Sequence, residues 1–223
     1  MSDKRITIVS GHYGSGKTNI AVNLAFDLKA RHENVAIADI DIVNPYFRTK
    51  DSQEQLSQNG IRLICSEYAN TNVDIPALPQ DIYAITDDKS MHCILDVGGD
   101  ERGALALGRI SAKIVEENNF QMLYVVNMYR PLTKTADDAI EVLREIENAC
   151  KIKFTAIVNN SNLGAETTAK TVLDSLDYVK EISRKTSLPV LMTTVNENLL
   201  KELSGKIDNL YSLSLQKNVI KEK

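Results

Sequence analysis

The sequence predicts an α/β fold: one three-layer domain over residues 1–223, with a mostly parallel sheet of about seven strands. Two observations lead to this class. Strand-like and helix-like segments alternate along the chain, which is the pattern of βαβ units with helices on both faces of a parallel sheet. A length of 223 residues suits one such domain and does not require a second.

Short apolar runs rich in β-branched side chains predict the strands, at residues 5–10, 34–39, 61–65, 91–96, 121–127, 153–159 and 188–193. Apolar residues at helical spacing predict the helices, at residues 17–31, 49–58, 104–118, 134–150, 167–185 and 196–204. The stretch 70–79 is polar and then broken by prolines, so it predicts a loop. Ligands of such sheets bind beyond the carboxyl ends of the strands, where we therefore expect the functional side chains.

The turn after the first strand reads GHYGSGKTN and fits the pattern G-x-x-x-x-G-K-[ST] at Gly11, Gly16, Lys17 and Thr18. Glycines let successive backbone N–H groups point at one anion, and the following helix N-terminus adds partial positive charge. In this pattern Lys17 reaches the β- and γ-phosphates, and the Thr18 hydroxyl completes a Mg²⁺ site. A glycine-rich turn without a ligand is the alternative. The strand before and the helix after favour a P-loop NTPase.

The residues expected to bind the nucleotide in this loop are Gly11, His12, Tyr13, Gly14, Ser15, Gly16, Lys17, Thr18 and Asn19.

The second strand ends in AIADIDIVNPYFR, which places Asp39 and Asp41 two residues apart. In an extended stretch both carboxylates face the same way. A carboxylate there can hold Mg²⁺ or orient a water toward the γ-phosphate. Solvated or helix-capping aspartates are the alternative.

The fourth strand ends in CILDVGGDERGALALGR, an apolar run that closes on Asp96. An aspartate at such a strand tip can hold a water of the Mg²⁺ shell. Gly98 and Gly99 then allow the backbone to approach the γ-phosphate and to move when it leaves. A plain glycine turn before a helix is the alternative.

The fifth strand ends in MLYVVNMYRPLT, with Asn127 and Arg130 at its tip. Thr133 or Thr135 is expected to cap the next helix. A capped helix start without ligand contact explains this segment as well as a direct role does.

The sixth strand ends in FTAIVNNSNLG, where Asn159 and Asn160 can present amides to a base edge. Many GTPases carry N-K-x-D here, and its carboxylate suits the two neighbouring donors of guanine. This sequence has Asn162 where that aspartate would be, which favours adenine. Asparagines that only shape a turn are the alternative.

Taken together, these segments resemble the MinD/ParA/CobQ group of P-loop proteins over most of the chain. The carrying segments are GHYGSGKTNIAVNLA, DID, DVGG, VVNMYRPLT, VNNSNLG and LPVLMTTVNENLL. The resemblance implies an ATP-binding, Mg²⁺-dependent fold whose aspartate-containing segments change shape on hydrolysis. By that match Asp41 positions the attacking water, Asp39 and Asp96 lie near the metal, and Asn159 approaches the base.

One departure from this group concerns the position of its signature lysine, which reaches across a dimer to the partner's nucleotide. Here that position is His12. A histidine is shorter and mostly neutral at pH 7, so a nucleotide-sandwich dimer is not expected. A homodimer through other surfaces stays open, and Arg48 and Arg102 are the candidates for a substitute cation.

The composition of the chain argues against nucleic acids and membranes as binding partners. The formal charge is −4 without a basic block, which gives no support to nucleic-acid binding. No apolar run approaches a membrane span, MSDKRITIVS is no signal peptide, and NLYSLSLQKNVIKEK alternates like a strand, so we expect no membrane binding. Three cysteines far apart in the sequence suggest reduced thiols in a cytoplasmic protein.

The favoured function is an ATPase switch that assists the assembly or activation of an unidentified partner enzyme. The alternative is an ATP-dependent small-molecule ligase or kinase of the cobyrinate or dethiobiotin synthetase type. A partitioning or positioning ATPase is the least favoured of the three, because of the charge balance and the C-terminal sequence. The chain offers little room for a substrate-binding domain, which weighs toward the switch.

Overall fold

The computed structural model describes residues 4–40, 53–65, 80–99 and 101–214. It confirms the α/β class, with one sheet covered by helices on both faces. The sheet has eight strands in the order β3-β2-β4-β1-β5-β6-β7-β8, and every neighbouring pair is parallel. The strand count is therefore one more than the sequence predicted.

The strands are β1 (Ile6–Ser10), β2 (Val35–Asp39), β3 (Arg62–Ile64), β4 (His92–Asp96), β5 (Phe120–Val126), β6 (Ala156–Asn159), β7 (Val190–Asn196) and β8 (Leu210–Leu213). The α-helices are α1 (Lys17–Lys29), α2 (Gln53–Gln58), α3 (Ala84–Asp87), α4 (Glu101–Glu117), α5 (Ala136–Cys150), α6 (Ala169–Asp174), α7 (Leu176–Thr186) and α8 (Glu197–Leu203). Short 3₁₀ turns are η2 (Gln80–Tyr83), η3 (Pro131–Thr133) and η4 (Gly164–Glu166).

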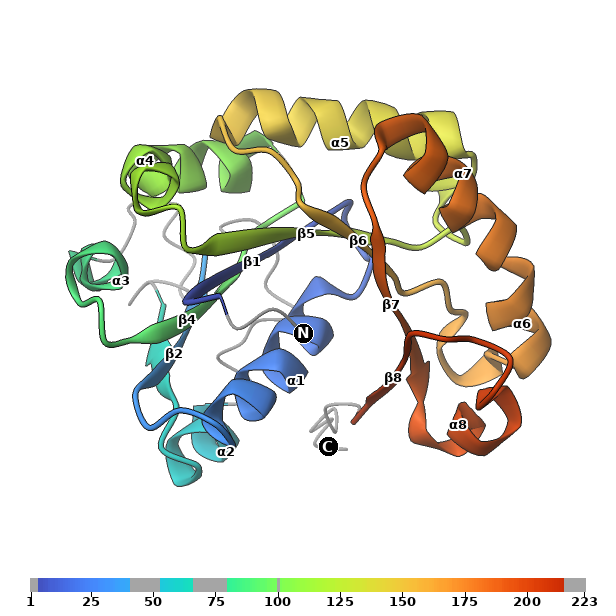
Figure 1. The fold of residues 1–223 in the computed structure, drawn as a ribbon, viewed down its shortest axis with the longest axis horizontal. Helices are drawn as coiled ribbons and strands as arrows, with labels where there is room; N and C mark the ends of the chain where they lie inside the picture. The colour runs from blue at the N-terminus through green and yellow to red at the C-terminus, as the bar shows by residue number, and fades with distance from the viewer. Residues whose placement is uncertain (1–3, 41–52, 66–79, 100, 215–223) are drawn as a thin grey trace, which may run out of the picture.

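Helices lie on both sides of the sheet (Figure 1). Two large apolar clusters pack them against it, and a third, smaller cluster lies around α6 and α8. Helix α1 packs on one face of the sheet, with α2 beside it, and buries Ile20, Leu24 and Leu28 there as the helical spacing predicted. Helices α3, α4, α5 and α7 cover the other face. Because both faces are covered, central strands are buried on both sides, as in β1, where all five residues are buried and Ile6, Ile8 and Val9 belong to the apolar clusters.

Three parts of the structure differ from the elements predicted by range. The turn η2 and the short helix α3 lie at residues 80–87, where no element was predicted. The alternating segment near the C-terminus forms β8, which extends the parallel sheet beside β7. The single helix predicted over 167–185 is two helices that meet at Ser175, whose hydroxyl donates to the Val172 carbonyl (2.7 Å) and accepts from the Asn159 amide (2.9 Å). Such side-chain bonds compete with the regular helical pattern.

Thr135 caps α5, as one of the two predicted alternatives, and forms a capping box with Asp138. Cys93 and Cys150 are buried and form no disulfide with each other. Within the described residues, none of the helices has the length and apolar character needed to cross a membrane.

The strand order decides which loops meet at the carboxyl edge of the sheet. β1 lies between β4 and β5, with β2 beyond β4 and β6 beyond β5. The turn that follows β1 is therefore flanked by the segments after β4 and β5. This is the edge at which the sequence placed its candidate residues.

Candidate functional site

The turn between β1 and α1 has a backbone that only glycine adopts easily. Gly11, Gly14 and Gly16 have φ angles of 154°, 73° and 90°. Two of them also lack room for a side chain. A Cβ on Gly11 would lie 2.2 Å from the Val125 carbonyl oxygen, and a Cβ on Gly16 would lie 2.2 Å from Nδ2 of Asn160. The predicted phosphate-binding loop therefore has the curled, glycine-dependent form that the motif requires.

Bonds within the loop fix its curvature and the position of its lysine. The Ser15 N–H donates to the His12 carbonyl (3.1 Å), and Lys17 Nζ donates to the same oxygen (3.3 Å). Lys17 is only 6% exposed, so its ammonium is held inside the loop. Gly16 is the N-cap of α1, and the helix N-terminus faces the loop interior.

The second half of the site is a hydroxyl and two carboxylates. Thr18 Oγ1 donates to Asp96 Oδ2 at 2.6 Å, which joins the first turn of α1 to the tip of β4. The β2–β4 register sets Asp39 directly opposite Asp96, and both are buried. The structure thus brings the neighbouring residues Lys17 and Thr18 to the strand ends that carry Asp39 and Asp96, two segments far from them in the sequence.

This donor set fits a magnesium ion. Mg²⁺ is usually held by one or two carboxylates together with substrate phosphates and waters, and a P-loop hydroxyl adds one ligand. Among the residues the structure describes, no group of three or more His, Cys, Asp or Glu side chains suits a metal.

His12 is half-buried, and its Nδ1 lies 2.9 Å from the Tyr13 carbonyl oxygen. Burial lowers the pKa of its imidazole, and the charges of Lys17 and Arg130 lower it further against the opposing effect of the Tyr13 carbonyl. The ring is therefore neutral at pH 7, as the sequence analysis expected. It supplies no fixed positive charge to the loop.

The remaining loop residues differ in exposure. Tyr13 is 61% exposed, Ser15 is buried, and Asn19 is half-buried in the first turn of α1. Tyr13 is thus the loop side chain most open to a ligand or a partner.

The two asparagines predicted to read the base have other contacts here. Asn160 donates to the Ser15 carbonyl (2.6 Å) and accepts from the Thr194 hydroxyl (2.5 Å), so it braces the phosphate loop. Asn159 is completely buried, with its amide bonded to Ser175 and to the Ser161 N–H. Both amides therefore support the phosphate loop and the adjoining turn, and their predicted contacts with a base stay predictions.

The segment after β4 lies directly against the loop. A Cβ on Gly99 would be 2.2 Å from the Gly11 carbonyl oxygen, 2.7 Å from the Tyr13 nitrogen and 2.8 Å from the His12 carbonyl carbon. These are backbone atoms and have little freedom to give way. Gly99 thus allows a close backbone-to-backbone approach to the loop, while the predicted approach of this segment to the γ-phosphate stays a prediction.

Arg130 is a cation near the phosphate loop, although the sequence analysis placed it only at the tip of the fifth strand. The Arg130 side chain, after β5, lies 3.4 Å through Nε from the position a Gly14 Cβ would take. The sequence placed Arg130 at a strand tip. Its closeness to Gly14 becomes visible only in the structure, because β5 pairs with β1.

Three sequence-predicted features fall where no comparison is possible. Asp41 and Arg48 lie outside the described residues, as does the side chain of Arg102. The predicted roles of the water-positioning carboxylate and of these two arginines stay predictions.

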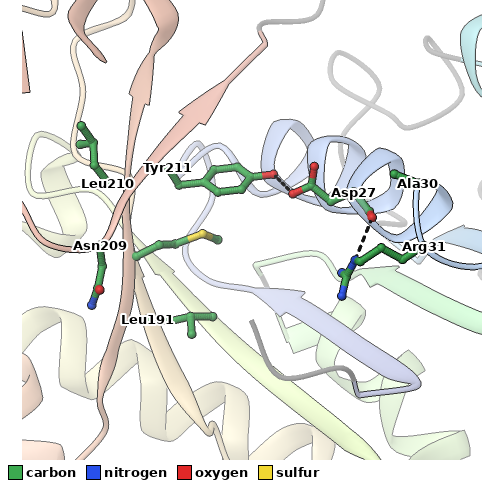
Figure 2. A pocket seen from close by; sticks show the side chains of 8 residues that line it. Asp27, Ala30, Arg31, Leu191, Asn209, Leu210 and Tyr211 are labelled. Carbon is green, nitrogen blue, oxygen red and sulfur yellow. Dashed lines mark hydrogen bonds between the residues drawn. The ribbon is translucent and has the colours of Figure 1, made fainter. Parts of the chain in front are cut away.

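A pocket of about 520 Å³ lies at the opposite edge of the sheet, between the last turn of α1 and the first residues of β7 and β8. Figure 2 shows Tyr211 reaching across it to Asp27, with a hydrogen bond of 2.6 Å, while Arg31 approaches from the end of α1. None of the sequence-predicted nucleotide residues lines this pocket.

The sequence of this chain matches a known protein family over most of its length. The family model of the CobQ/CobB/MinD/ParA nucleotide binding domain matches residues 6–186. No curated protein sequence matches the chain.

Solved structures share the fold at low identity. They include FtsY from Thermotoga maritima (TM-score 0.59, 17% identity, 86% of this chain and 62% of that chain) and FtsY from Mycoplasma mycoides (0.57, 16%, 86% and 60%). A third is the signal recognition particle receptor FtsY from Elizabethkingia anophelis in complex with GDP (0.54, 17%, 88% and 59%). The chain thus spans 59 to 62% of the length of these structures.

Proposed function

This chain belongs to the CobQ/CobB/MinD/ParA nucleotide-binding domain family, and we propose that it is a Mg²⁺-dependent ATPase that acts as a switch for a partner protein. The observation that carries the proposal is the Thr18–Asp96 hydrogen bond of 2.6 Å beside the Lys17 loop. It joins a phosphate-binding loop to the carboxylate that a metal-bound nucleotide requires.

Each residue of the loop has a distinct task in this proposal. The backbone N–H groups of the loop and Lys17 bind the β- and γ-phosphates. Thr18, Asp39 and Asp96 hold Mg²⁺, which neutralises developing charge on the phosphates. Asp41 orients the water that attacks the γ-phosphate, a role taken from the family resemblance.

A switch needs a path from the phosphates to a surface. The backbone contact of Gly99 with the loop provides one, because the same segment leads directly into α4. Four exposed apolar side chains stand in the segments that follow β1, β4, β5 and β6, namely Tyr13, Leu105, Leu132 and Leu163. In this proposal these side chains are the contacts through which a protein partner would bind at this edge.

We expect the protein to prefer ATP over GTP. The Asn162 amide donates to the Asn160 carbonyl (2.7 Å) and accepts from the Gly164 N–H (3.1 Å), so it shapes the turn and offers guanine no carboxylate. A bidentate carboxylate contact discriminates by about 1–3 kcal/mol, and its loss removes the advantage of GTP. Competition of ATP and GTP for one fluorescent nucleotide measures this. A tenfold preference for GTP would contradict it; GTP has the same base as the GDP bound to one structural neighbour.

The switch also predicts a characteristic turnover. Basal ATP hydrolysis should be slow, and a protein captured with nucleotide-trapped chain should accelerate it when added back purified. Steady-state phosphate release with and without that protein measures the effect, with small carboxylic acids added in parallel. Fast turnover that depends on a carboxylic acid and ignores the captured protein would favour the ligase or kinase instead.

A further inference from the structure

The short loop after β5 is held rigidly beside the phosphate loop. The Arg130 N–H donates to the Asn127 carbonyl (3.1 Å), and the Arg130 carbonyl accepts from the Thr133 N–H (3.1 Å). Asn127 is buried, its side chain accepts from the Tyr129 N–H, and the Thr133 hydroxyl donates to its carbonyl (3.0 Å). The backbone from which the Arg130 side chain projects is therefore fixed on both sides.

The Arg130 side chain lies over the phosphate loop. Its Nε, Cζ and Cδ atoms are 3.4, 3.5 and 3.7 Å from the position a Cβ on Gly14 would occupy. Gly14 has a φ of 73° and carries no side chain, so the guanidinium comes close to the loop backbone. Arg130 is exposed, so its guanidinium lies on the solvent side of the loop, where it could contact a polyphosphate bound there.

The charge of this guanidinium is not used elsewhere. Within the described residues, no acidic side chain forms an ion pair with Arg130. Its field nevertheless reaches the loop, because it contributes to the lowered pKa of His12. A cation held beside a glycine-rich turn without an acidic partner is suited to binding an anionic ligand.

Other positive charge on the loop is limited. Lys17 is buried with its ammonium on the His12 carbonyl, and the His12 ring is neutral at pH 7. A guanidinium is always charged and presents a planar fork of N–H donors that matches phosphate oxygens. Arg130 is thus the described side chain best placed to add a second cation from the solvent side.

We propose that Arg130 is a catalytic residue that binds the γ-phosphate of the nucleotide from within the same chain. The inference rests on the proposed function, since it assigns a role in triphosphate hydrolysis. In that step the water oxygen forms a bond to the γ-phosphorus, while the bond from phosphorus to the β–γ bridging oxygen breaks. The nucleoside diphosphate leaves with the electron pair, so the products are the nucleoside diphosphate, inorganic phosphate and a proton. Arg130 stabilises negative charge on the γ-phosphoryl oxygens during this transfer.

The test compares Arg130→Gln, Arg130→Lys and the control Lys134→Gln in the full chain. Lys134 is exposed in the same segment and loses the same charge in its variant. Fluorescent ATP and ADP analogues give the affinities, and single-turnover experiments give the hydrolysis rate. We expect Arg130→Gln to slow hydrolysis by about 100-fold or more and to weaken ATP binding by about tenfold, with ADP binding within about threefold of wild type.

Arg130→Lys keeps the charge and is expected to retain the tighter binding of ATP, with slower hydrolysis because the fork is lost. Lys134→Gln should match wild type in every measurement. Equal weakening of ATP and ADP in Arg130→Gln would overturn the proposal, since it would mean that the side chain only supports the loop. Wild-type values in Arg130→Gln would overturn it too, with the proposed function intact. Absence of nucleotide binding in the wild type would instead overturn the proposed function itself.

Discussion

Replacing Lys17 with alanine is expected to abolish productive binding of Mg-ATP. The ammonium is held in the loop by the His12 carbonyl, at 3.3 Å, and only 6% of the residue is exposed. Its removal leaves the phosphate charge uncompensated in a partly desolvated site. The cost is about 3–4 kcal/mol, equal to a loss of about 100- to 1,000-fold in affinity.

Titration with fluorescent ATP and ADP analogues measures this loss, and thermal unfolding checks that the variant is folded. The matched control is Lys29→Ala, at the other end of α1, where the lysine lies far from the loop. Wild-type affinity in Lys17→Ala would mean that the phosphates bind elsewhere on the molecule. Equal losses in both variants would point to a damaged helix α1.

Replacing Gly99 with alanine is expected to disrupt the phosphate loop from outside. The added methyl group would lie 2.2 Å from the Gly11 carbonyl oxygen and 2.7 Å from the Tyr13 nitrogen, so the two backbones must separate. Overpacking of this kind costs about 1–3 kcal/mol of stability. Because the displaced atoms belong to the phosphate loop, we expect nucleotide affinity to fall by about 100-fold.

The same change at Gly108 is the control, because this glycine lies within α4 and its nearest neighbour is the Ala149 carbonyl oxygen at 3.4 Å. Gly108→Ala should keep nucleotide affinity and gain up to about 1 kcal/mol of stability from helix propensity. Chemical denaturation and nucleotide titration of both variants test the pair. Unchanged affinity in Gly99→Ala would show that this segment stands away from the loop in solution.

The sequence by itself determined the fold class and the phosphate loop. Both depend on local signals: alternating apolar runs for the βαβ units, and glycines with a lysine and a threonine at fixed spacing for the loop. The meeting of Thr18 with Asp96 also followed from the sequence, because parallel strands bring their carboxyl ends to one edge. The cap of α5 was narrowed by the local sequence to Thr133 or Thr135, and the structure selects Thr135.

Tertiary structure decided which side chains meet between segments distant in the sequence. The Asn160 amide braces Ser15 across 145 positions, so its role in the loop is invisible to any local pattern. Arg130 reaches Gly14 only because β5 pairs with β1. Strand β8 exists because β7 offers an open edge, while its own four residues carry a weak signal. Packing and strand order determine these contacts, because they bring together segments that are far apart in the sequence.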